Sequence, residues 1–443
     1  MGRVLRTYLS WIALAIMFSA APASAQPLDA RGVEVLRTWY RLTLELVRHT
    51  PTYSPPVASR SFAYLGVTAF EVIAGGNSQF VSLGGQLNGF ETPPTPAPGA
   101  KYDEAVALQA AMARAIGSLF GNTGPTGQRA ITAIGKKLHA TAAQSVDPEV
   151  AARSEAYGRA VADHVLAWSM DDGGATVENM GFPFSYELAE GPAHWIPTST
   201  IGQQQAPLLP AWGENRTFAM PQGASCSLPP PPAYSEDKTS QFYREALEVY
   251  EVSKSLTAEQ QAIARFWSDD PMLSSTPPGH WLSIAMQVLD DRDAPLAERI
   301  EALARLGIGL ADAFIGCWHD KFKYDLVRPV TYIQRLIDPE WQAILITPPF
   351  PEYPSGHSTQ SGAAAEVLTH IFGANHAFED MTHEDDGMPP RKFASFWHAA
   401  EEAGISRLYG GIHYRAAIER GLDQGRCIAA YANALRTRVR SDE

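Results

Sequence analysis

The stretch GVEVLRTWYRLTLELVRHT, residues 32–50, shows the pattern that decides the fold. Its apolar residues recur every three or four positions, as on one face of an α-helix, and the run stops before Pro51. No segment shows the sustained alternation of a strand between hairpin turns. The sequence therefore predicts an all-α fold. Further helices are expected near residues 60–75, 102–120, 127–144, 148–170, 236–268, 278–290, 296–320, 356–372, 391–404 and 413–436.

A change of composition divides the helical pattern into two halves. Residues 171–235 are rich in Gly, Pro and aromatic residues, which favours a long loop that docks onto a surface. The helical regions on either side are residues 26–170 and 236–443. We predict two bundles, each of the four-helix type, joined by this central excursion.

The N-terminus has the layout of a secretory signal peptide. Arg3 and Arg6 precede the apolar run WIALAIMFSA, and the small residues of APASA suit cleavage after Ala25. The apolar run is too short to span a bilayer. Residues 1–25 are therefore predicted to be removed, and the protein is expected to be exported, periplasmic or secreted, without stable membrane insertion. The alternative is a buried N-terminal helix.

The charge balance and the cysteines exclude some classes of protein. The chain has 48 acidic and 35 basic side chains, a net charge of −13, so a nucleic-acid partner is not expected. Cys226, Cys317 and Cys427 are far apart, which excludes a disulfide framework and a zinc ribbon. The sequence leaves open whether two of them form one bridge.

The first cluster of candidate functional residues is CWHDKFKYDLVRPV, residues 317–330. Lys321 and Arg328 are two helical turns apart, so both are expected on one helix face, with Trp318 one turn before Lys321. Pro329 is expected to end this helix. The alternative is a solvated basic stripe at a helix end.

The second cluster is FPEYPSGHST, residues 350–359, directly before an Ala-rich helical segment. Pro354 and Gly356 shape a turn, and Ser355 with the first free N–H groups of the helix can face an anion. His357 adds an imidazole that titrates near neutral pH. The alternative is an ordinary Ser cap beside a surface histidine.

The third cluster is SRLYGGIHYRAAIERG, residues 406–421. Gly410 and Gly411 should interrupt the helix, so that Arg407 and His413 lie on either side of a turn. Taken alone, this pair is better explained by Arg407 as a surface ion-pair partner and His413 as a satisfied core residue. Together, the three clusters predict a socket for a compact tetrahedral oxyanion, with one histidine bonded to the central atom and the other moving protons.

The order of these motifs resembles the three-part signature of the vanadium-dependent haloperoxidase and type 2 phosphatidic acid phosphatase (PAP2) superfamily, over about the last quarter of the chain. Two further positions are similar to the chloroperoxidase-like haloperoxidases, which place halide-pocket residues where Trp318 and Phe350 stand. The stretch FWSDDP resembles a family segment whose acid, here Asp270, supports the Arg of the third motif.

The resemblance implies a vanadate cofactor whose vanadium is bound by His413, with His357 as the acid–base group and Lys321 polarising bound peroxide. The oxyanion would be held by Lys321, Arg328, Ser355, the Gly356 amide, Arg407 and His413. The implied reaction oxidises halide with hydrogen peroxide to hypohalous acid, which halogenates an organic acceptor. Alternatively, phosphate occupies the socket of a phosphatase in which His413 is the nucleophile, or the socket is retained without catalysis.

The chain departs from the family pattern at one position. Many relatives carry an Asp four residues after the histidine of the third motif, where this chain has Ala417. Glu419 and Asp423 do not have the helical spacing to replace it directly. Ser358, which follows the motif histidine, is a position where subfamilies differ, so the halide preference stays open.

Overall fold

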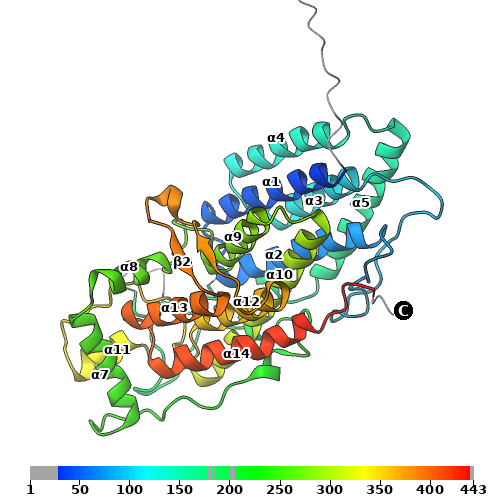
Figure 1. Ribbon diagram of the computed structural model, residues 1–443. Helices are drawn as coiled ribbons and strands as arrows, with labels where there is room; N and C mark the ends of the chain where they lie inside the picture. The colour runs from blue at the N-terminus through cyan, green and yellow to red at the C-terminus, as the bar shows by residue number, and fades with distance from the viewer. Residues whose placement is uncertain (1–27, 178–181, 184, 200–204, 440–443) are drawn as a thin grey trace, which may run out of the picture.

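The computed structural model describes residues 28–177, 182–183, 185–199 and 205–439 (Figure 1). The predicted signal peptide, residues 1–25, lies outside the described residues. Helices dominate the described chain, and the all-α prediction is confirmed. Two three-residue strands, β1 (Phe378–Asp380) and β2 (Arg391–Phe393), pair antiparallel. They lie inside or beside segments expected to be helix or loop, because strands this short give no alternation to detect.

The helices of the first half are α1 (Leu28–Arg48), α2 (Pro55–Ala74), α3 (Glu104–Leu119), α4 (Pro125–Ala142), α5 (Pro148–Ser169) and α6 (Gly174–Val177). Those of the second half are α7 (Gln241–Lys254), α8 (Ala258–Phe266), α9 (Thr276–Asp291), α10 (Leu296–Tyr324), α11 (Pro329–Leu336), α12 (Gly356–Phe372), α13 (Phe396–Tyr409) and α14 (Arg415–Asn433). Three short 3-10 helices are η1 (Trp212–Glu214), η2 (Gly223–Cys226) and η3 (Glu384–Asp386).

The long helix α10 connects the two groups of helices in Figure 1. It packs against α2 of the first group and against α12 and α14 of the second. At the α2 contact, a Cβ on Gly66 would lie 2.9 Å from the Ala304 backbone, so the small residue permits the close approach. Helix α9 also packs against α1 and α2. The two groups therefore share α10, and residue 235 is not a boundary between separately packed bundles.

Helix α2 is the helix of the described chain that is long and apolar enough to cross a membrane, and its residues 56–74 are all buried within the fold.

The described part of the 171–235 excursion lies along α10 and the motif loops. Leu208 N–H donates to the Pro349 carbonyl at 2.7 Å, and Leu228 N–H donates to Asp320 Oδ2 at 2.8 Å. A disulfide joins Cys226 in the excursion to Cys427 on α14. The bridge that the sequence left open is thus present, while Cys317 is free and buried.

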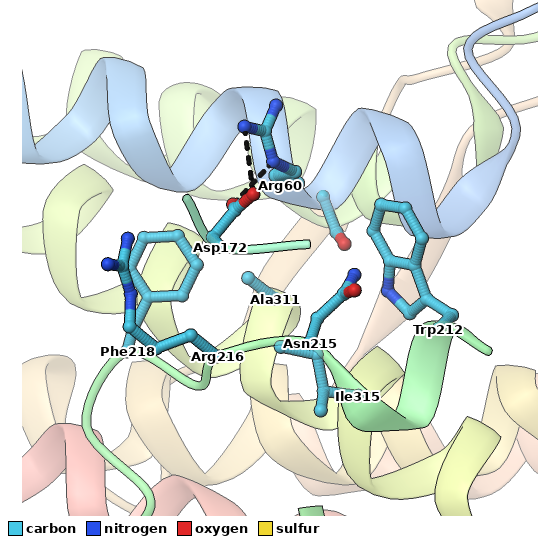
Figure 2. Close-up of a pocket in the computed structure, with 9 residues that line it drawn as sticks. Arg60, Asp172, Trp212, Asn215, Arg216, Phe218, Ala311 and Ile315 are labelled. Carbon is cyan, nitrogen blue, oxygen red and sulfur yellow. Dashed lines mark hydrogen bonds and ion pairs between the residues drawn. The ribbon is translucent and has the colours of Figure 1, made fainter. Parts of the chain in front are cut away.

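The excursion begins at a buried ion pair with α2. Figure 2 shows Asp172 facing Arg60, whose Nε lies 2.6 Å from the carboxylate, and Tyr64 also donates to Asp172 at 2.8 Å. The cavity beside this pair has a volume of about 10 Å³, room for at most one water molecule. The ion pair between Asp172 and Arg60 therefore attaches the start of the excursion to the core.

Two helix boundaries differ from the sequence prediction. The segment 236–268 contains two helices, because Thr257 caps the start of α8 through a reciprocal hydrogen bond with Gln260. Pro329 begins α11 instead of ending α10, which stops at Tyr324 where Asp325 adopts a left-handed backbone. Proline is favoured at the first helical position because its missing N–H has no partner to lose there. The sequence predicted Lys321 and Arg328 on one helix face. The structure contradicts this, because the two residues belong to different elements.

The crossing of α12 and α14 fixes the second motif against the third. A Cβ on Gly425 would lie 2.1 Å from the Thr359 carbonyl oxygen, a clash that only backbone movement relieves. We expect Gly425→Ala to lower the free energy of unfolding by about 1–3 kcal/mol or more, measured by urea denaturation. The control is Gly117→Ala on α3, which meets no atom within 4 Å and should raise stability by about 0.5–1 kcal/mol. Equal effects at both sites would contradict this account of the crossing.

Candidate active site

The site is built around the turn that precedes α12. Ser355 is the N-cap of this helix, and its Oγ accepts a hydrogen bond from Ser358 N–H at 3.3 Å. Ser355 N–H in turn donates to the Ala417 carbonyl at 3.1 Å, which ties the turn to α14. A Cβ on Gly356 would be in ordinary van der Waals contact with the Trp318 ring at 3.7 Å and with the Lys321 side chain at 3.9 Å, so the helix start lies against both residues. The turn thus places the positive end of α12 beside the buried Trp318 and Lys321 side chains.

Arg328 and His413 meet directly, although one precedes α11 and the other precedes α14. Arg328 Nη1 lies 3.1 Å from His413 Nε2 and donates to the Ile412 carbonyl at 2.8 Å. Arg328 Nε donates to the Phe350 carbonyl at 2.9 Å. Its remaining nitrogen, Nη2, is buried and has no hydrogen-bond partner. The guanidinium is therefore fixed in place with one donor unused.

Glu352 orients His413, and the sequence reasoning missed this residue. Its Oε1 accepts from His413 Nδ1 at 2.8 Å and from Tyr414 N–H at 2.9 Å. With Nδ1 donating to Glu352, the lone pair of the neutral imidazole is on Nε2, which accepts from Arg328 Nη1 at 3.1 Å and is the atom that a metal would bind in place of that contact. Glu352 supplies from the second motif the carboxylate that Ala417 cannot supply from the third. The sequence feature that could have identified Glu352 is its position as an acid between two prolines in FPEYP.

Arg407 and His357 share one backbone carbonyl. Arg407 Nη2 donates to the Trp267 carbonyl at 2.6 Å, and the His357 side chain also hydrogen-bonds to the Trp267 backbone. His357 Nε2 is buried without a partner. The carboxylate of Asp270 forms no ion pair with Arg407 within the described residues, although its charge is near enough to act on it. Backbone carbonyls, more than Asp270, support this arginine.

Lys321 is buried at the same place but is occupied differently from expectation. Its Nζ donates to the carbonyls of Pro351 (3.0 Å), Glu352 (3.1 Å) and Pro354. In its charged form the ammonium group has three donors, and all three then hold the turn before α12. Its role toward an oxyanion stays a prediction, which requires one of these carbonyl bonds to be exchanged.

An aromatic pair borders the cationic groups. The ring centroids of Trp318 and Phe350 are 4.9 Å apart, and Trp318 Nε1 donates to the Leu208 carbonyl of the excursion at 3.2 Å. The Lys321 Nζ and the Arg328 guanidinium each lie 5.1 Å from the Phe350 ring centroid. The predicted halide-pocket residues therefore lie together, beside two positive charges. Their role toward halide is untested.

Burial governs the protonation of the site. It lowers the pKa of Lys321 to about 7 and those of Arg328 and Arg407 to about 10. It also lowers the pKa values of His357 and His413 well below the ordinary imidazole value, with help from the nearby arginines. Both imidazoles are therefore neutral at pH 7.

The donors and charges of this site fit a bound oxyanion such as vanadate. Three basic side chains are almost entirely buried there, and burial raises the pKa of Glu352, the acid that contacts the socket, to about 8. The buried positive charge is unfavourable unless an anion offsets it. The unpartnered Nη2 of Arg328, Nε2 of His357 and Oγ of Ser358 are buried polar atoms that this fold leaves to be satisfied. His413 Nε2 would provide the neutral nitrogen that binds the metal. The side chains of this site therefore fit a bound vanadate.

The fold and the site together define a class: helical proteins with a buried, cation-rich oxyanion socket beside two neutral histidines. Residues 301–442 match the family described as the VCPO second helical-bundle domain. The crystal structure of a bacterial vanadium-dependent iodoperoxidase is 37% identical, covers 93% of this chain and 98% of its own, and superposes with a TM-score of 0.84. The chain belongs to the vanadium-dependent haloperoxidase family.

More distant relatives share the fold. A holo-type bacterial vanadium-dependent chloroperoxidase is 16% identical over 92% of this chain and 95% of its own, with a TM-score of 0.67. The vanadium chloroperoxidase of Curvularia inaequalis is 23% identical over 58% of this chain. The match spans 56% of that fungal enzyme, little more than half its length.

The contact between Glu352 and His413 leads to a testable prediction. Glu352→Ala should weaken vanadate binding by about 10–100-fold, the usual effect of removing a partner of a metal-binding histidine. Glu352→Gln keeps an acceptor oxygen for both N–H groups and should retain most of the affinity. Equilibrium dialysis against vanadate measures both variants, with circular dichroism as the test of folding. Equal affinities for wild type and folded Glu352→Ala would contradict the orienting role.

Proposed function

We propose that the protein is a vanadate-dependent haloperoxidase that oxidises halide with hydrogen peroxide to hypohalous acid. The observation that carries the proposal is His413, whose Nδ1 is bound by Glu352 so that the Nε2 lone pair points at Arg328, in a buried socket of cations and unpartnered donors. Vanadate held there would supply Lewis-acid activation of peroxide without a change in the oxidation state of the metal.

Different side chains would bind the vanadate and transfer the proton. His413 Nε2 would bind the vanadium, while Arg328, Arg407, Ser355 and the Gly356 amide would hold its oxygens. His357, neutral and with Nε2 unpartnered, would accept the proton of incoming peroxide.

We infer that iodide is the preferred halide substrate. The 37% identical structure is described as an iodoperoxidase, whereas the matches described as chloroperoxidases are less similar in sequence. Trp318 and Phe350, beside Lys321 and Arg328, form the apolar and cationic surface that a polarisable anion would meet. The organic acceptor of the hypohalous acid would react outside the socket.

The assay uses purified protein with vanadate and peroxide, and adds iodide, bromide or chloride in separate reactions. Halide oxidation that requires added vanadate is the expected result. A phosphomonoester is tested in parallel, because a phosphatase would use the same socket. Phosphate release that vanadate inhibits, without halide oxidation, would overturn the proposal in favour of a phosphatase.

We also infer that the protein is exported. The signal-like pattern of residues 1–25 motivates this inference, and the disulfide between Cys226 and Cys427 supports it, since structural disulfides persist in oxidising compartments. Detection of the processed chain outside the cytoplasm is the expected result. An unprocessed chain found only within the cytoplasm would overturn the inference.

A further inference from the structure

A second cluster of titratable side chains lies beside the oxyanion socket without belonging to it. Asp269 follows α8, His280 is on α9, and His383 lies between β1 and β2. The three side chains are buried, with exposed fractions of 1%, 0% and 6%. Their potential ligand atoms all lie within 4.8 Å of one another. Three separate segments of chain thus place a carboxylate and two imidazoles at one point.

The distances within this cluster suit a small metal ion. His280 Nδ1 lies 2.9 and 3.1 Å from the two Asp269 oxygens, and His383 Nε2 lies 3.3 Å from Asp269 Oδ1. Zinc with bonds of about 2.0–2.1 Å in a tetrahedron spaces its ligand atoms roughly 3.3 Å apart. Small adjustments of side chains would therefore admit the ion.

Each imidazole has a carboxylate on its far nitrogen. His280 Nε2 lies 2.8 Å from Asp380 Oδ2, and His383 Nδ1 lies 3.3 Å from Asp386 Oδ2. Asp386 is itself paired with Arg48 of α1. Histidines that bind metals usually donate their other N–H to a carboxylate, which fixes the ring and directs the lone pair of the ligand nitrogen inward. Both histidines of this cluster have that arrangement.

The buried Nε2 atom of His383 faces Asp269 without forming a well-aligned hydrogen bond. Without a metal, His280 would be an imidazolium held between Asp269 and Asp380, which accounts for both of its nitrogens. In that arrangement His383 Nε2 has its 3.3 Å ion-pair approach to Asp269 Oδ1, which an ion at the centre of the cluster would replace with a metal bond.

We propose that Asp269, His280 and His383 bind a divalent first-row transition-metal ion of the zinc type, with Asp380 and Asp386 orienting the two imidazoles. Two imidazoles and one carboxylate suit such ions, whereas calcium and magnesium prefer oxygen ligands. The site is separate from the vanadate socket, and the proposal does not depend on the proposed peroxidase activity.

The position of the site indicates what the ion would do. The Trp267 ring stacks on His280, with centroids 4.5 Å apart and planes at 17°. The Trp267 carbonyl holds Arg407 of the socket at 2.6 Å. An ion at Asp269 would thus fasten the segment after α8 to α9 and to the β1–β2 hairpin. Its role is structural support of the carbonyl on which Arg407 and His357 depend.

The test measures metal binding by the full chain purified through a tag without histidines and stripped with a chelator. Circular dichroism first establishes that the stripped protein is folded. Zn²⁺ is then titrated calorimetrically, and Co²⁺ is followed by its visible absorption. We expect one equivalent of either ion, with cobalt bands of low coordination number. The melting temperature should rise when Zn²⁺ is added and fall again with chelator.

Variants locate the binding site. His383→Ala and Asp269→Asn should each lower the affinity for Zn²⁺ by at least about 100-fold, since loss of even an outer partner costs about 10–100-fold. His194→Ala removes another histidine–aspartate pair, His194 with Asp325, and should leave affinity unchanged. His413→Ala should also bind one Zn²⁺, which separates this site from the socket.

Two results would overturn the proposal. The first is a folded wild-type protein that binds neither Zn²⁺ nor Co²⁺, a result that does not depend on the folding of any variant. The second is unchanged zinc affinity in folded His383→Ala and Asp269→Asn. Either result would leave the cluster as an ion network with His280 as its central cation.

Discussion

His413→Ala is expected to abolish vanadate retention. The substitution removes the neutral Nε2 on which the proposed metal bond depends, while Arg328 keeps its bonds to the Ile412 and Phe350 carbonyls. The affinity for vanadate should fall by more than about 100-fold, because loss of an outer partner alone costs about 10–100-fold. Equilibrium dialysis with elemental analysis of vanadium measures the change.

The control for this prediction is His398→Ala. His398 is an exposed residue in the first turn of α13, and its replacement should not alter vanadate binding. The melting temperature of wild type should rise with added vanadate, and that of His413→Ala should not. A folded His413→Ala variant that retains vanadate with wild-type affinity would remove the assignment of His413 as the vanadium ligand, and the haloperoxidase proposal would lose its main support.

The sequence predicted most of the helices because their apolar periodicity is long and strong. It could not predict features that depend on one or two backbone angles. The left-handed Asp325 ends α10, and Pro329 then opens α11, so the basic pair was brought together by a turn rather than by one helix face. The β1–β2 hairpin was missed because each strand has only three residues.

The candidate site was predicted as a set of residue types but not as a network. All three motifs converge, since Arg328 contacts His413 and the turn of the second motif contacts Ala417 on α14. Glu352 could not be assigned from helical spacing, because its carboxylate reaches His413 across 61 positions of sequence. The three carbonyl bonds of Lys321 depend on the path of the turn at residues 351–354, which composition does not specify.

The cations of the socket also depend on their surroundings. The chain has a net charge of −13, yet Lys321, Arg328 and Arg407 are each at most 1% exposed. Burial depresses the pKa values of all three, so the folded protein stabilises their charged forms less than water does. A bound oxyanion would reverse that imbalance. Burial of the three cations therefore lowers the stability of the anion-free protein and increases its affinity for an anion.

His357→Ala is expected to retain vanadate and lose turnover. The imidazole contacts the Trp267 backbone but none of the groups that anchor His413, so the affinity for the oxyanion should change little. The turnover number with peroxide and iodide should fall by about 10²–10⁴-fold, the usual contribution of a general base. Steady-state kinetics at saturating vanadate measures this, together with vanadate bound per chain.

The pH dependence distinguishes a proton-transfer role from a structural one. The pKa of His357 lies well below the ordinary imidazole value because the ring is buried and Arg407 is near. A base is active when deprotonated, so the wild-type rate should persist below pH 6.5 and fall only at lower pH, where His357 becomes protonated. His357→Ala should lose that acidic limb. A folded variant with an unimpaired rate, or with the same acidic limb as wild type, would show that the proton goes elsewhere.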